Sequence, residues 1–188
     1  MQVSLDGFVG GPNGDLDWME WNWDEELKNY VNKLTEPVDT ILLGRKLAEG
    51  FIPYWANAAS NPDHPEFPFA KKMNDTPKIV FSKTTKNVEP EPPAGSWTNT
   101  KLAKDDFVEE ISDLKKQPGK DIIVYGGAQF VSDVIKYGLL DEYHLFINPV
   151  ALGKGLTIFQ SLESRLNLRL IYSRPFDCGI VAFHYTPR

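Results

Sequence analysis

Residues 121–136 read DIIVYGGAQFVSDVIK, and this stretch indicates how the chain folds. Asp121–Tyr125 is mostly β-branched or aromatic, which favours a buried strand. Gly126 and Gly127 then open a segment whose apolar residues recur at helical spacing. These apolar residues are Phe130, Val131, Val134 and Ile135. A strand that passes through glycines into an amphipathic helix is the repeating unit of an α/β fold.

The same alternation of strands and helices extends in both directions. The further predicted strands are Val38–Leu43, Lys78–Phe81, Ser96–Thr100, Glu142–Asn148, Leu166–Ser173 and Gly179–Tyr185. Predicted helices begin at Asp24, at Arg45 (ending at Phe51) and at Asp105, while the proline-rich stretch Pro53–Pro68 is expected to be irregular. We therefore expect one domain over residues 1–188: a three-layer α/β/α fold with a mostly parallel mixed sheet and an antiparallel C-terminal edge.

Composition limits the classes of partner. The 188 residues carry 20 Lys and Arg against 26 Asp and Glu, a net charge of −6, which argues against nucleic acid or an anionic membrane as a partner. No apolar run reaches the ~18 residues of a membrane span. The single cysteine excludes an internal disulfide and fits a reducing compartment. We expect a cytoplasmic protein that acts on a small molecule.

Three predicted strands end in residues suited to an anion. Gly126-Gly127 precedes a helix, Gly44-Arg45-Lys46 follows the strand at 38–43, and Ser82-Lys83 follows the strand at 78–81. Each has an ordinary alternative: a simple turn, a solvated basic helix turn, or a plain loop. Together they favour a nucleotide phosphate site at the carboxyl ends of the strands. Neither GxxxxGK[ST] nor GxGxxG is present, so a P-loop or a standard dinucleotide fingerprint is not supported.

Other candidate sites carry less weight. The histidines His64, His144 and His184 are far apart in sequence, and we expect structural roles for them and no metal site. Cys178 is expected to be a small buried hydrophobe. Carboxylates gather near the first loop, and Trp18, Trp21 and Trp23 beside them either line an aromatic-binding cleft or cover a helix.

Several motifs, in order, resemble one known family over nearly the whole chain. They are Val3–Phe8, Gly11–Trp18, Asp39–Lys46, Lys78–Thr84, Tyr125–Ala128, Gly138–Leu145 and Asn148–Gly155. The chain resembles the dihydrofolate-reductase-like family, in the branch similar to the C-terminal reductase domain of the bacterial riboflavin-biosynthesis deaminase–reductase. That resemblance implies a dihydrofolate-reductase-like fold and an NADPH-dependent oxidoreductase.

The resemblance also implies roles for particular residues. Gly126, Gly127, Ala128 and Gln129 would face the NADPH pyrophosphate, and Gly44, Arg45 and Lys46 would serve its phosphates. Ser82 and Lys83 would approach the 2′-phosphate, and Tyr125 would lie beside the nicotinamide. Asp6, Asp17 and Trp18 would line the substrate end, with Asp6, Asp17 and Glu26 as the candidate catalytic carboxylates and Glu26 the one suited to a pteridine.

The expected reaction is hydride transfer to a small heterocyclic or ribosyl substrate, as in 5-amino-6-(5-phosphoribosylamino)uracil reduction. Dihydrofolate reduction is one alternative. A dinucleotide-binding dimer without turnover is another, suggested by Leu47 where the family commonly has Ser or Thr and by the missing deaminase half. The cations Arg45, Lys46 and Lys83 predict NADPH over NADH.

We also expect a homodimer. The strands at 142–148 and 166–185 carry apolar residues on both faces, so the second face is covered either by a partner copy or by a helix layer. The family resemblance points to pairing through the C-terminal strands, and we expect the contact to include the strand Asp141–Pro149 or the closing pair of strands. If the strand at 141–149 forms the contact, Phe146→Asp should split the dimer.

Overall fold

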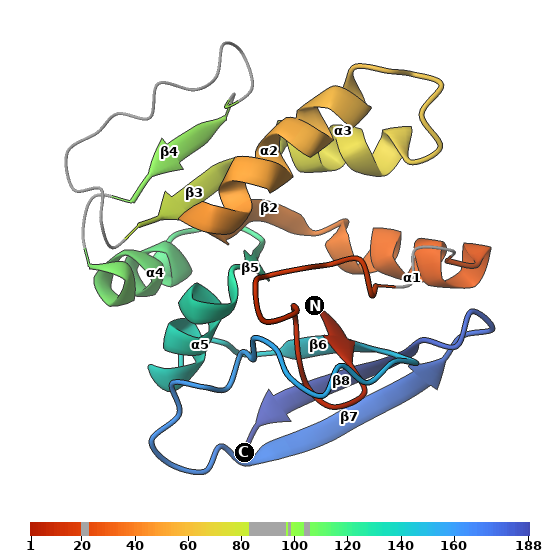
Figure 1. The fold of residues 1–188 in the computed structure, drawn as a ribbon. Coiled ribbons are helices and arrows are strands. Elements are labelled where there is room, and N and C mark those ends of the chain that lie inside the picture. The colour runs from red at the N-terminus through yellow and green to blue at the C-terminus, as the bar shows by residue number, and fades with distance from the viewer. Residues whose placement is uncertain (20–22, 83–96, 98, 104–105) are drawn as a thin grey trace. The chain divides into compact units, whose positions relative to one another are not determined.

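The computed structural model describes residues 1–19, 23–82, 97, 99–103 and 106–188 (Figure 1). Lys83, Trp21 and part of the predicted strand at 96–100 lie outside these residues. The chain divides into two compact units, Met1–Leu34 with Val131–Arg188 and Thr35–Phe130. Each unit has its own four-stranded sheet. The expectation of one domain over residues 1–188 stays a prediction.

The sheet of the Thr35–Phe130 unit is entirely parallel. Its strands are β2 (Val38–Gly44), β3 (Lys78–Phe81), β4 (Thr100–Leu102) and β5 (Asp121–Gly126). They run in the order β4-β3-β2-β5 (Figure 1). Continuous apolar runs such as Ile41–Leu43 are typical of strands covered on both faces, and these residues are fully buried.

Helices cover both faces of this parallel sheet. Helices α2 (Arg45–Ala59) and α3 (Phe67–Asp75) pack on the face that carries Ile41, Leu43 and Val80. Phe81 lies on the other face because side chains alternate along a strand, and it stacks on Phe130 at 4.7 Å. Phe107 of α4 (Phe107–Lys116) contacts the same Phe130 ring. Within this unit the expected helix–sheet–helix layering is therefore present.

The proline-rich stretch is helical at both ends, so the prediction of an irregular segment over Pro53–Pro68 was wrong there and holds only for residues 60–66. Helix α2 continues through Pro53 to Ala59, and α3 begins at Phe67. A proline inside a helix removes one backbone hydrogen bond. Here the burial of Ala48, Ile52 and Ala58 along one side of α2 outweighs that loss.

The second unit combines one parallel and two antiparallel pairings. Strand β1 (Gln2–Ser4) runs parallel to β6 (Tyr143–Asn148), and β6, β8 (Val181–Pro187) and β7 (Leu168–Pro175) follow as an antiparallel series with β7 at the edge. Helix α1 (Glu25–Thr35) contacts this sheet through Tyr30, whose ring lies edge-on to Phe146. Helix α5 (Ala128–Lys136) buries Val131, Val134 and Ile135 as predicted.

The α/β class with a mostly parallel arrangement and an antiparallel C-terminal edge is confirmed. Among the described residues, no helix has the length and apolar character that a membrane crossing requires.

Candidate functional site

The three anion-suited junctions lie side by side at one end of the parallel sheet. Gly44 at the end of β2 is in register with Phe81 at the end of β3, and Leu43 is in register with Gly126 at the end of β5. Parallel strands that end together place the residues that follow them at one edge. We call this group the carboxyl edge: Gly44, Arg45, Lys46, Ser82, Gly126, Gly127, Ala128 and Gln129.

Glycines allow a close approach of two backbones at the carboxyl edge. A Cβ on Gly44 would lie 3.0 Å from the Phe130 Cβ and 3.4 Å from both the Gly126 oxygen and the Gly127 nitrogen. Gly126 has a φ of 150°, which favours glycine. Gly127 differs, because a Cβ there would meet nothing within 4 Å. The space above Gly127 is therefore free of protein atoms among the described residues.

The helices that start at the carboxyl edge have N-termini suited to an anion. Neither α2 nor α5 has an acidic residue in its first turn, and Gly44 gives α2 no side-chain cap. In contrast, α1 and α4 begin with acidic first turns, and the Leu27 and Val108 N–H groups donate to Asp24 and Asp106. The positive end of a helix dipole attracts anions, and acidic side chains there would repel them.

Cations stand beside these helix starts. Arg45 and Lys46 are exposed in the first turn of α2, and Arg45 Nε lies 3.2 Å from Glu49 Oε1. Ser82 follows β3 directly and is half-buried, while Lys83 lies outside the described residues. Leu47 packs against the hydrophobic core of this unit.

Tyr125 lies one residue before the glycine pair and faces the α2 side of the sheet. Its ring packs 5.2 Å from that of Phe51, and burial raises the pKa of its hydroxyl. That hydroxyl is buried and has no hydrogen-bond partner among the described residues. The predicted position beside a nicotinamide stays a prediction.

Asp6 in the other unit joins two loops. Its carboxylate accepts hydrogen bonds from Ser4 Oγ at 2.6 Å and from the Leu152 and Gly153 N–H groups at 3.1 and 2.7 Å. These hydrogen bonds, led by that from Ser4, lower the pKa of Asp6 to about 2. Asp6 is therefore ionised at neutral pH and orders the loop around residues 152–153.

The remaining predicted substrate residues are separate in their contacts. Asp17 is exposed in a turn, and Trp18 Nε1 donates to the Asp15 carbonyl at 3.0 Å. Glu26 in the first turn of α1 forms an ion pair with Arg174, whose guanidinium lies over the Tyr30 and Phe176 rings. Among the described residues, no hydrogen bond or ion pair joins Asp6, Asp17 and Glu26, and their catalytic roles stay predictions.

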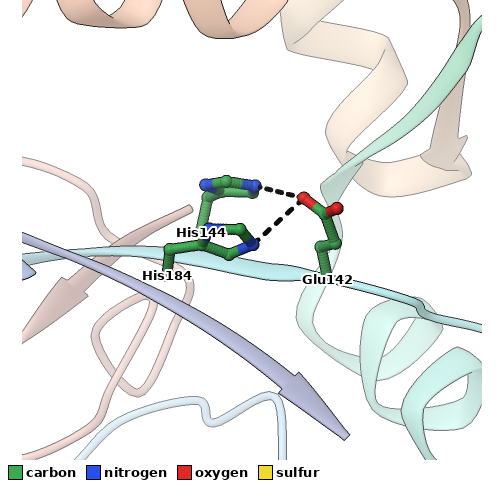
Figure 2. Close-up of side chains that lie close together, drawn as sticks. All are labelled: Glu142, His144 and His184. Atoms are coloured by element: carbon green, nitrogen blue, oxygen red, sulfur yellow. Dashed lines mark hydrogen bonds and ion pairs between the residues drawn. The ribbon is translucent and has the colours of Figure 1, made fainter. Parts of the chain in front are cut away.

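A group that the sequence reading did not connect is also present in this unit. His144 and His184 stack on each other beside Glu142 (Figure 2). The sequence holds one signal for this group. Glu142 and His144 are two residues apart at the start of a predicted strand, and such residues share a face. The pairing of β6 with β8, which adds His184, is not visible in the sequence.

The chain has a dihydrofolate-reductase-like fold, as two solved structures show. A putative riboflavin biosynthesis protein from Shewanella sp. PV-4 matches with a TM-score of 0.71 and 25% identity, over 100% of this chain and 96% of that one. Dihydrofolate reductase from Enterococcus faecalis, complexed with NADP(H) and RAB-propyl, shares the fold, with a TM-score of 0.59, 17% identity and coverage of 100% and 93%.

Within that class, residues 1–182 match the RibD C-terminal domain family, and the chain belongs to it. The uncharacterized protein YyaP of Bacillus subtilis (strain 168) is 34% identical over 187 residues, which cover 98% of this chain and 91% of that relative. The resemblance inferred from the sequence motifs is thus confirmed, and the chain is a RibD C-terminal reductase-like domain.

Proposed function

We propose that the chain is an NADPH-dependent reductase of a small heterocyclic or ribosyl substrate, of the type of 5-amino-6-(5-phosphoribosylamino)uracil. Membership of the RibD C-terminal domain family supports the reductase class. The observation that carries the proposal is the carboxyl edge, where two helix N-termini without acidic first turns flank a glycine pair.

The chemistry of the carboxyl edge fits a dinucleotide. Backbone N–H groups at helix starts and the exposed cations Arg45 and Lys46 suit the negative charge of a pyrophosphate and a ribose phosphate. The open space above Gly127 lets a phosphate approach the backbone. When bound, NADPH would supply the hydride, and the protein would position it.

The residues proposed to act on the substrate lie in the Met1–Leu34 segment. We assign Trp18 to a wall of the substrate end, and Asp17, Glu26 or a water molecule to delivery of the proton that accompanies reduction. Asp6, which is ionised at neutral pH, is given a positioning role through its hydrogen bonds to the backbone of Leu152 and Gly153. We place this activity in the cytoplasm, where a single free cysteine is typical.

Gly127→Ala tests the cofactor site with Gly50→Ala as its matched control. Both substitutions add one methyl group where nothing lies within 4 Å. Gly50 is inside α2, so alanine there should stabilise the protein by about 0.5–1 kcal/mol and leave cofactor binding unchanged. Gly127→Ala should keep the thermal midpoint and lower NADPH affinity, measured by fluorescence titration. Equal NADPH affinity in both variants would argue against a site at Gly127.

Turnover distinguishes the reaction from its alternatives. NADPH oxidation with the ribosylaminopyrimidine substrate supports the proposed reaction. Oxidation with dihydrofolate alone would favour dihydrofolate reduction, and tight NADPH binding without oxidation by either substrate would favour a binding protein.

A further inference from the structure

His144 and His184 form a pair across two antiparallel strands. They are register partners on β6 and β8, their ring centroids are 4.2 Å apart, and the rings are inclined by 19° (Figure 2). Glu142 precedes β6 and projects to the same face as His144, since side chains alternate along the chain. Its Oε2 lies 2.9 Å from His144 Nε2 and 3.1 Å from His184 Nε2.

These separations are close to those in a metal site. Zinc binds imidazole nitrogen and carboxylate oxygen at about 2.0–2.2 Å, so two ligands of a tetrahedral ion lie about 3.3 Å apart. The carboxylate oxygen already lies within a few tenths of an ångström of that separation from both nitrogens. One ligand atom from each of the three residues lies within 4.8 Å of those from the other two. Small side-chain adjustments would therefore make room for an ion.

Hydrogen bonding alone leaves this cluster incompletely satisfied. His144 Nε2 is hydrogen-bonded to Glu142, whereas His184 Nε2 is buried without a hydrogen bond despite its 3.1 Å approach. His144 Nδ1 is also buried without a partner among the described residues, so no second hydrogen bond holds that ring in one tautomer. Buried polar atoms without partners are uncommon and unfavourable. A cation bound to both Nε2 atoms would satisfy the one that is unpaired.

Exposure and charge also suit an ion that enters from solvent. The Glu142 side chain is 55% exposed, and the His144 and His184 side chains are 21% and 14% exposed. The Glu142 carboxylate would supply a negatively charged ligand to the ion. Two imidazoles with one carboxylate match zinc and its transition-metal neighbours, whereas Mg²⁺ and Ca²⁺ prefer oxygen ligands.

We propose that Glu142, His144 and His184 form a binding site for a divalent transition-metal ion of the zinc type, with a fourth position open to water. Three protein ligands and one water is the coordination of an open zinc site. The proposal does not depend on the proposed reductase activity, because its ligands and its readout are separate from the cofactor.

Metal titration of the untagged, chelator-treated chain tests this site. Calorimetry with Zn²⁺ should give one ion per chain, and Co²⁺ should give visible absorption bands of a four-coordinate ion. His184→Gln and Glu142→Gln should each weaken Zn²⁺ binding by at least tenfold. Zn²⁺ should also raise the thermal midpoint of the unmodified chain more than that of either variant.

Two control variants separate this site from other metal-binding groups. His64→Gln removes the histidine of the other unit, and Cys178→Ser removes the only thiol. Both should bind Zn²⁺ as the unmodified chain does. If His184→Gln does not fold, Zn²⁺ binding by Glu142→Gln, which changes an exposed side chain, tests the proposal. Absence of binding at micromolar Zn²⁺, equal binding by Glu142→Gln, or loss of binding in Cys178→Ser would overturn the proposal.

Discussion

At the scale of single residues, Asp6 shows how a motif carboxylate can be structural. It accepts one side-chain and two backbone hydrogen bonds and ties the first loop to residues 152–153. Gly155 lies close to the same loop, since a Cβ there would be 2.3 Å from the Gly10 oxygen. The Asp6 motif and the glycines of the Asn148–Gly155 motif therefore stabilise one local structure.

Asp6→Asn should destabilise the protein in a pH-dependent way. The pKa of Asp6 is lowered from 3.8 to about 2, so the ionised carboxylate stabilises the folded state above about pH 4 and that stabilisation is lost as the pH falls through about 2. We expect a lower urea midpoint for Asp6→Asn at pH 7 and a smaller decline in stability from pH 4 to pH 2. Asp17→Asn, in an exposed turn, should match the unmodified chain in both respects. Identical midpoints for Asp6→Asn and the unmodified chain would contradict this role.

Arg45, an exposed cation in the first turn of α2, is proposed to contribute to the choice of cofactor. Its ion pair with Glu49 joins side chains that are 48% and 57% exposed, so it contributes little to stability. Arg45→Gln should lower NADPH affinity about tenfold, as expected for loss of a charged contact to phosphate, with little change for NADH. Fluorescence titration with both cofactors measures this, and Lys71→Gln in α3 is the control cation. A parallel loss of NADH affinity would show that Arg45 does not read the 2′-phosphate.

The residues of the carboxyl edge were predictable because each follows a strand directly in sequence. Glycines and cations next to a buried strand signal a ligand-facing turn from local information alone. Glu142, His144 and His184 were not predictable in the same way, since their contact depends on the register of β6 with β8. Register is set by packing and turn geometry, which local sequence patterns do not reveal.

At the scale of secondary structure, sequence patterns located most of the elements. Strands β2, β3 and β5 coincide with apolar runs bounded by glycine or polar residues. The predicted helix from Arg45 is too short, because proline ordinarily ends a helix, whereas α2 continues through Pro53 to Ala59. Burial of α2 against the sheet outweighs the low helix propensity of Pro53.

The junction between α3 and β3 contains a buried lysine, Lys78. Lys78 Nζ donates to the Asn74 and Thr76 carbonyls, both at 2.8 Å, and the residue is 2% exposed. Burial lowers its pKa from 10.5 to about 8. Above about pH 8 the unfolded chain therefore binds more protons at this site than the folded chain, so this residue makes stability rise between about pH 8 and 10.

Lys78→Met should remove that rise in stability. Urea unfolding at several pH values between 8 and 10 should show a flatter profile for Lys78→Met than for the unmodified chain. Lys116→Met, which removes an exposed lysine of α4, should keep the rise. A profile for Lys78→Met that is parallel to that of the unmodified chain would contradict the role given to Lys78.

At the scale of the whole molecule, the edge strand of the second sheet bears on assembly. Three large apolar residues in the middle of β7, which lies at the sheet edge, are exposed: Leu170 by 48%, Ile171 by 46% and Tyr172 by 39%. The register shifts between Leu170 and Tyr172, so Ile171 is the extra residue of a β-bulge. Exposed apolar edge strands are common sites of pairing between chains.

The structure changes the test of the expected homodimer. Phe146 is 6% exposed and lies edge-on to Tyr30 within its own unit, so Phe146→Asp would disrupt the core of that unit instead of a dimer contact. We propose that β7 is the strand through which two copies pair. In a dimer with a twofold axis, β7 of one copy would lie against β7 of the other. This would pair the two exposed strand edges and cover Leu170 and Ile171 of both copies.

Leu170→Asp should therefore convert a dimer to a monomer without unfolding it. The side chain is already half exposed in one chain, so an aspartate there is tolerated by the monomer, but it would be buried without a partner in the dimer. Sedimentation at micromolar concentration should give about twice the chain mass of 21.3 kDa for the unmodified protein, and a single chain mass for Leu170→Asp. Tyr54→Asp, at an exposed aromatic of α2, should leave the dimer intact. A monomeric unmodified chain would refute the dimer, and a dimeric Leu170→Asp would place its contact away from β7.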